Sequence, residues 1–132
     1  MRDRAAKAQR ILAAQQQLHR IEQWKLAELQ RELAELTSAQ LEIISALNDN
    51  NALHGLFIDA TARRLGTLAE EAERVSRKTT DQSLRTTEHA VRVRASERLE
   101  QAVAQELQRG LEGKELLDII DQYLANKVTS LP

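Results

Sequence analysis

The sequence predicts an all-α fold: a long antiparallel two-helix coiled-coil hairpin with a short C-terminal amphipathic helix. Strong helix formers dominate its 132 residues, which include one proline and four glycines. Leucine recurs at coiled-coil spacing on both sides of one polar break. That break is short, so the two helices should be antiparallel neighbours. We expect a single helical-hairpin domain over residues 1–132.

The first helix is expected over about residues 4–47, because no glycine or proline occurs between Ala5 and Leu47. Its apolar residues fall on the a and d positions of a heptad repeat: Leu26, Leu29, Leu33, Leu36, Ile43 and Leu47. Upstream, Ile11, Leu18 and Ile21 form a stripe that is out of phase by one residue. This phase slip predicts a local change in the supercoil, with the helix continuing through it.

The turn is expected at residues 48–51, where Asn-Asp-Asn-Asn can end one helix and cap the next. A second helix should follow over about residues 52–109. Folding the chain at residue 50 predicts four apolar layers: Leu36 with Leu65, Leu33 with Leu68, Leu29 with Ala72, and Leu26 with Val75. Beyond these layers the stripe turns polar, so the core should weaken toward the termini. The polar residues there are Thr79, Thr80, Gln82, Thr86 and His89.

Gly110 and Gly113 predict an interruption before a short helix over about residues 114–127. This helix has a wide apolar face formed by Leu116, Leu117, Ile119, Ile120, Tyr123 and Leu124. A simple hairpin offers this face no partner. It should either fold back on the two arms or meet another protein, and the sequence leaves both alternatives open.

Charge is distributed unevenly along a chain whose net charge is −1. Residues 1–20 carry five basic groups and one acidic group, and residues 99–132 carry three basic and six acidic groups. An antiparallel hairpin would bring these oppositely charged arms together. The basic groups of residues 63–98 alternate with acids and lack aromatic neighbours, so no nucleic-acid binding is expected.

Nothing in the sequence resembles a reaction centre, and we expect no enzyme. The three histidines, His19, His54 and His89, lie far apart, and no metal-ligand, nucleophile or phosphate-loop motif accompanies them. No catalytic, cofactor-binding or metal residues are therefore assigned, and no cofactor is expected. No apolar run approaches the length of a membrane span, and cysteine is absent. We expect a cytoplasmic protein without membrane insertion.

Two groups of residues are candidates for partner binding. Leu53, Leu56 and Phe57 gather apolar side chains beside the turn, where two helices cannot bury all of them. They form either a docking surface or a cap packed beneath the turn, and we give the two interpretations equal weight. The second group is the C-terminal apolar face, represented by its residues Leu116, Ile120 and Tyr123.

The hairpin pattern and the charged C-terminal run resemble the FliJ family of flagellar export proteins, whose relatives are stalk proteins of type III secretion systems. The local likeness lies in Glu97-Arg98-Leu99-Glu100, Glu112, Lys114-Glu115-Leu116 and Asp118-Ile119. The architectural likeness covers nearly the whole length. Gly110 and Gly113 depart from the family, which usually keeps that region helical, and the turn comes early.

The resemblance implies a non-enzymatic stalk or coupling factor for the export ATPase. Such proteins insert their paired termini into the ATPase ring, and they contact the export gate and cycle chaperones. Two alternatives stay open. One is a homo-oligomeric structural coiled coil, in which a second copy covers the C-terminal apolar face. The other is an adaptor or chaperone-type interaction protein.

Overall fold

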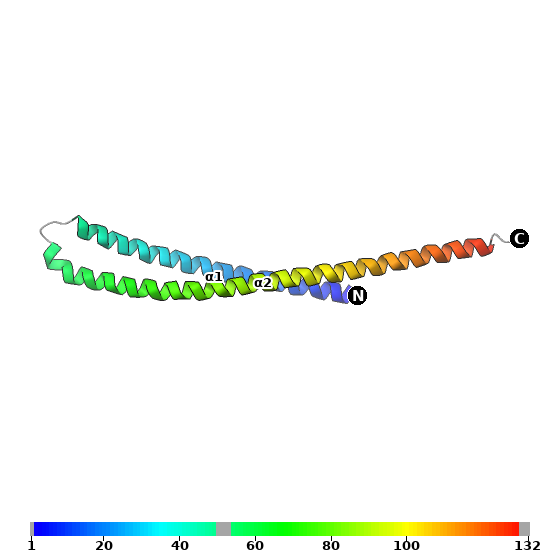
Figure 1. The fold of residues 1–132 in the computed structure, drawn as a ribbon, viewed down its shortest axis with the longest axis horizontal. Helices are drawn as coiled ribbons and strands as arrows, with labels where there is room; N and C mark the ends of the chain where they lie inside the picture. The colour runs from blue at the N-terminus through cyan, green and yellow to red at the C-terminus, as the bar shows by residue number, and fades with distance from the viewer. Residues whose placement is uncertain (1, 50–53, 130–132) are drawn as a thin grey trace. The chain divides into compact units, whose positions relative to one another are not determined.

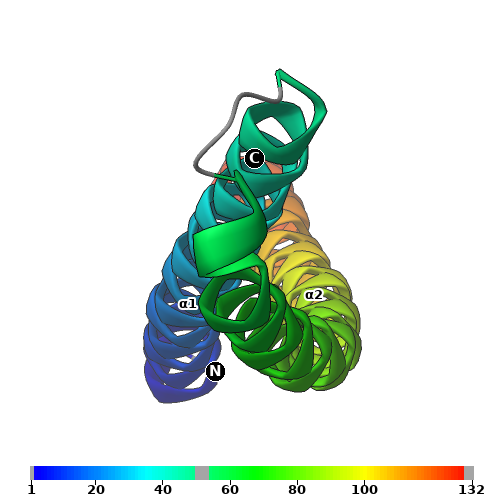
Figure 2. The same cartoon turned by 90° about the vertical axis from the view of Figure 1, so that its left-hand side faces the viewer.

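The computed structural model describes residues 2–49 and 54–129, excepting the side chains of residues 54–56 and 128–129. The described residues form two α-helices and no strand: α1, Arg2–Asn48, and α2, His54–Thr129 (Figure 1). Figure 2 looks toward the two helix ends that flank residues 50–53, and the coloured ribbon is helical throughout. The two helices pack against each other, which confirms the predicted all-helical hairpin for this part of the chain.

The packing divides into two compact units, and each helix contributes to both of them. The terminal unit contains Met1–Gln17 and Val91–Pro132, and the inner unit contains Leu18–Ala90. The contacts described below lie within one unit or the other.

Local sequence explains why α1 is continuous. Asp3 places a negative charge in its first turn, where the exposed N–H groups of a helix favour an anion. Further along, Arg31 pairs with Glu28 at 2.7 Å and with Glu35 at 3.0 Å, at helical spacings of three and four residues. These carboxylates, Glu28 first, raise the pKa of Arg31 above its ordinary value. At the end of the helix, the Asp49 N–H donates to the Ser45 carbonyl at 3.0 Å.

Threonines occupy much of the polar part of α2, although β-branched residues are not strong helix formers. Their hydroxyls donate to the carbonyl oxygen four residues earlier. Thr79 bonds Val75 at 2.8 Å, and Thr86 bonds Gln82 at 2.8 Å. The side chains thus satisfy their own polar groups inside the helix, so α2 continues through this region.

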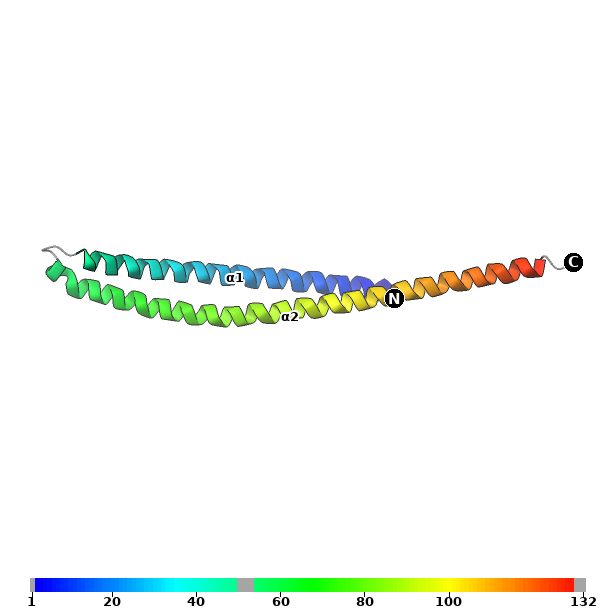
Figure 3. The same cartoon turned by 45° about the horizontal axis from the view of Figure 1, so that its top comes forward.

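The predicted interruption at Gly110 and Gly113 is wrong. The helix α2 runs through both residues to Thr129, and residues 114–127 are its last turns and not a separate helix (Figure 3). No described glycine has a positive φ, and a Cβ built on Gly113 would meet no atom within 4 Å. A glycine in a helix costs only about 1 kcal/mol relative to alanine, so the strong helix formers around it carry the helix through.

In the inner unit, a row of buried and half-buried residues runs along each helix at alternating spacings of three and four residues. On α1 the row is His19, Glu22, Leu26, Leu29, Leu33, Leu36, Gln40, Ile43 and Leu47. On α2 it is Thr61, Leu65, Leu68, Ala72, Val75, Thr79, Gln82, Thr86 and His89. These rows form the seam between the helices. Val75 is its most deeply buried residue at 2% exposure.

The terminal unit also has such a row on each helix, and many of its side chains are small. On α1 they are Ala5, Ala8, Leu12 and Gln15, and on α2 they are Val93, Ser96, Glu100, Val103 and Leu107. Ala8, Ser96 and Val103 are the buried members.

The predicted phase slip is also wrong. Ile11, Leu18 and Ile21 are exposed, and the heptad spacing continues without a shift. Polar residues such as Gln15 and Glu22 take the seam positions in this stretch. The single-domain prediction stays a prediction.

Candidate functional site

The predicted group beside the turn lies only partly within the described structure. Leu53 is outside the described residues, as is the side chain of Leu56. Phe57 lies near the start of α2 and is 59% exposed, so no described residue covers most of its ring. Whether this surface binds a partner stays a prediction.

The second predicted group lies on the last turns of α2, within the terminal unit. Leu116, Ile120 and Tyr123 are exposed, as is every other side chain from Leu111 to Lys127. At about 100° per residue, six of the seven large apolar side chains of this segment, all except Leu111, cover an arc of about 160°. We call this arc the C-terminal apolar face: Leu116, Leu117, Ile119, Ile120, Tyr123 and Leu124.

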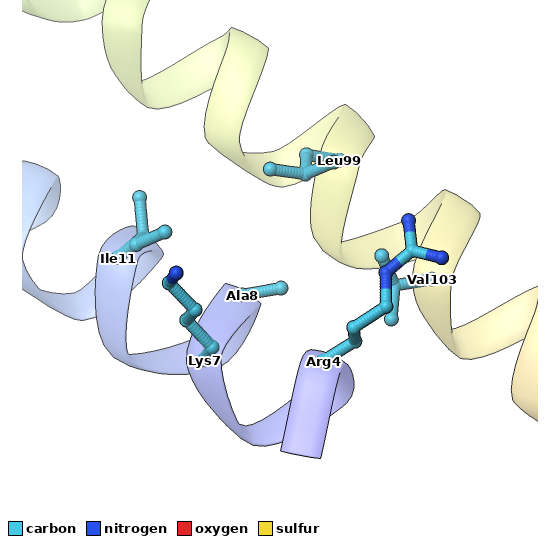
Figure 4. A pocket seen from close by; sticks show the side chains of 6 residues that line it. All are labelled: Arg4, Lys7, Ala8, Ile11, Leu99 and Val103. Atoms are coloured by element: carbon cyan, nitrogen blue, oxygen red, sulfur yellow. The ribbon is translucent and has the colours of Figure 1, made fainter. Parts of the chain in front are cut away.

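An open hollow of about 320 Å³ lies between the two helices of the terminal unit. Figure 4 shows Ala8 and Ile11 of α1 on one side and Leu99 and Val103 of α2 on the other. Two basic residues of α1, Arg4 and Lys7, complete the lining. The hollow therefore combines an apolar floor with a basic rim. The sequence pattern does not reveal this hollow, because its residues on α1 are small or out of phase with the apolar stripe.

One rim residue crosses from α1 to α2. The Arg4 guanidinium lies 3.5 Å from the Glu106 carboxylate, and both side chains are exposed. An exposed ion pair contributes little to stability, so Arg4 remains available to another anion.

A polar cluster interrupts the apolar seam of the inner unit. Gln82, 5% exposed, donates from Nε2 to the Glu22 backbone carbonyl at 3.2 Å and also to the Glu22 carboxylate. The Thr86 hydroxyl lies 3.3 Å from the same backbone carbonyl. Lys25 Nζ is 3.5 Å and His89 Nε2 is 4.0 Å from the Glu22 carboxylate.

The cluster favours an ionised Glu22. Hydrogen bonding from Gln82 is the largest cause that lowers the pKa of this carboxylate below its ordinary value of 4.5. Partial burial opposes the shift, and the charge and hydrogen bond of Lys25 add to it. A charge at a seam position is tolerated here because donors from both helices surround it.

Not all polar atoms near this cluster are satisfied. The Nδ1 atoms of His19 and His89 are buried and have no hydrogen-bond partner in the part of the chain that the structure describes. The described residues also contain no group of three histidine, cysteine or acidic side chains arranged to hold a metal ion. The chemistry that the cluster offers is hydrogen bonding between the helices.

The cluster also corrects the predicted register. The pairing of Leu36 with Leu65 would place Glu22 opposite Thr79. In the structure Glu22 instead bonds Gln82 and Thr86, which lie further along α2. The heptad spacing, extended upstream from Leu29 and Leu36, would have placed Glu22 in the seam, but it does not give the partner of Glu22 on α2.

Comparison of this chain with protein-family models, with curated proteins and with solved structures gave no significant match. Within the described ranges, neither helix has a stretch that is both long enough and apolar enough to cross a membrane.

Proposed function

We propose that this chain is a non-enzymatic coiled-coil component of a flagellar or type III protein export apparatus. In this proposal it acts in the cytoplasm as a stalk or coupling factor for the export ATPase. The observation that carries the proposal is the arrangement of the two helices in the terminal unit. There the start of α1 packs against α2, and α2 continues as a single helix whose side chains are exposed from Leu111 to Lys127.

Three further features support the proposal. The rows of seam residues alternate at three and four positions, the spacing of a two-stranded coiled coil. The seam of the terminal unit uses mostly small side chains with a few polar ones among them, which suits a paired end that works in contact with other subunits. The run from Glu97 to Ile119 resembles the charged C-terminal region of the FliJ family.

ATP hydrolysis by the export ATPase of the same cell tests the proposal directly. Adding the full chain should raise the rate, and the effect should saturate below one chain per ATPase subunit because one stalk serves a ring. An unchanged rate at all ratios would contradict the proposal. Tight binding of an export substrate without any effect on hydrolysis would instead favour the adaptor alternative.

A pair of charge-reversal variants sharpens this test. Arg4→Glu with Lys7→Glu changes the basic end of α1 and should reduce the stimulation of ATP hydrolysis. Arg63→Glu with Arg64→Glu makes the same change of charge at exposed positions of the inner unit and should preserve it. Equal effects of the two pairs would mean that the paired termini are not the part that acts on the ATPase.

A further inference from the structure

We infer that the terminal unit forms a twofold-symmetric, antiparallel dimer, in which the C-terminal apolar face of each copy fills the hollow of the other. The inference rests on the terminal unit alone and not on the proposed function. A chain that dimerises without stimulating ATP hydrolysis would contradict only the proposed function, and a monomeric chain that stimulates it would contradict only this inference.

The described residues leave the C-terminal apolar face uncovered. Its six large apolar side chains are all exposed, and a contiguous apolar surface of this kind marks an interaction site. The helix α2 is continuous from the hollow residues Leu99 and Val103 to Thr129. The segment therefore cannot fold back onto the hollow of its own chain.

The hollow and the face match in chemistry. The hollow has an apolar floor, with Ile11 and Leu99 exposed, and Arg4 and Lys7 form its rim. Residues 2–11 carry four basic groups and one acidic group, whereas residues 111–127 carry four acidic and two basic groups. On a helical projection of about 100° per residue, Glu115 and Asp121 border the two sides of the apolar face. A second copy would thus place acids at the basic rim when its apolar residues enter the hollow.

The antiparallel direction of the two copies follows from the positions of the hollow and the apolar face along α2. The hollow uses residues 99 and 103, which precede the apolar face on the same helix. A parallel twofold arrangement would place each face beside its own equivalent, with Glu115 facing Glu115. An antiparallel arrangement brings each face onto the hollow of the other copy, and both contacts form at once. Such an isologous contact closes on itself and stops at the dimer.

Sedimentation equilibrium of the full chain over a range of concentrations is the first measurement. The chain should be a dimer that dissociates on dilution and more readily at high salt, because part of the contact is between charges. Ile120→Asp places a charge in the apolar face and should raise the dissociation constant at least about tenfold. Gln122→Asp adds the same charge outside the apolar face, about 140° from its middle, and is the matched control.

A charge exchange tests the reciprocal geometry. Lys7→Glu and Asp121→Lys should each weaken the dimer when the variant is alone, because like charges then meet at both hollows. An equimolar mixture of the two variants should restore dimerisation, since each altered residue then faces an opposite charge on the other copy. Failure of the mixture to recover would overturn this arrangement.

If one of these substitutions lowers helicity, cross-linking tests the antiparallel dimer instead. The chain contains no cysteine, so one copy can carry Ile11→Cys and the other Leu124→Cys. A short bifunctional thiol reagent should join these two copies, and it should join them poorly when Gln122→Cys replaces Leu124→Cys. A monomeric mass at every concentration, or equal effects of Ile120→Asp and Gln122→Asp, would overturn the inference.

Discussion

The Gln82 amide connects α2 to Glu22 of α1 twice, through the carboxylate and through the backbone carbonyl at 3.2 Å. A hydrophobic seam resists separation but can slide, because one aliphatic layer resembles the next. A donor that must meet one particular acceptor has one best register. The pair therefore fixes how the helices of the inner unit align, as a polar residue at a core position does in other coiled coils.

Replacing Gln82 should destabilise the protein. Gln82→Ala removes both bonds to Glu22 and leaves its carboxylate half-buried without this donor, so the free energy of unfolding should fall by about 1–3 kcal/mol. Urea denaturation followed by circular dichroism measures this change. Ser83→Ala, at the exposed neighbouring position, should stay within about 0.5 kcal/mol of the wild type. Equal losses in the two variants would show that the Gln82 contact does not hold the helices.

Acid should weaken the protein through Glu22. The folded-state pKa of this carboxylate lies below 4.5, so its contribution is complete above that pH and is lost as the pH falls through the folded value. Glu22→Gln cannot titrate, so the stability difference from the wild type should stay constant near neutral pH and shrink below pH 4.5. Denaturation curves at several pH values measure it. Glu42→Gln, an exposed change on the same helix, should follow the wild-type profile.

The same substitution should destabilise the protein strongly at one apolar residue of α2 and hardly at all at another. Val75 is 2% exposed in the seam, and Leu84 is 62% exposed. Val75→Asp buries an unpaired charge and should lower the free energy of unfolding by at least about 3 kcal/mol. Leu84→Asp should change it by no more than about 0.5 kcal/mol. Thermal and urea denaturation compare the two, and similar losses would contradict the seam as described.

Adding a methyl group at Gly113 should stabilise the helix. The site has open space for a Cβ and a helical backbone, so Gly113→Ala should raise stability by about 0.5–1 kcal/mol. Amide hydrogen exchange should slow in residues 111–127. Gly66→Ala, also with open space around the new Cβ, is the matched control and should protect its own neighbourhood instead. No added protection around Gly113 would indicate that α2 is interrupted there.

The hairpin could be predicted from the sequence, because helix propensity and the leucine repeat are both local properties of the chain. The expected first helix, about residues 4–47, lies close to α1 at Arg2–Asn48. The prediction was wrong where it treated single residues as decisive. Gly110 and Gly113 were expected to interrupt the helix, but the helix formers around them continue it. Ile11, Leu18 and Ile21 were expected to shift the phase of the seam, but they are exposed.

The polar cluster and the hollow could not be predicted in the same way. Each depends on the alignment of the two helices, and that alignment is set partly by the polar contacts themselves. Counting from the turn gave a register in which Glu22 would face Thr79 and lose its bonds with Gln82. Similarly, Ala8 and Val103 are unremarkable in the sequence and become part of a hollow only once they lie side by side.

The exposed end of α2 has a consequence for how this protein responds to random substitution. Within the described structure, the side chains from Leu111 to Leu124 are exposed. Substitutions in this segment should not change the result of a screen that reports folding, provided that they keep the segment helical. A screen that reports cellular activity would instead reject changes at positions such as Leu116 and Ile120. The difference between the two screens would map the binding surface residue by residue.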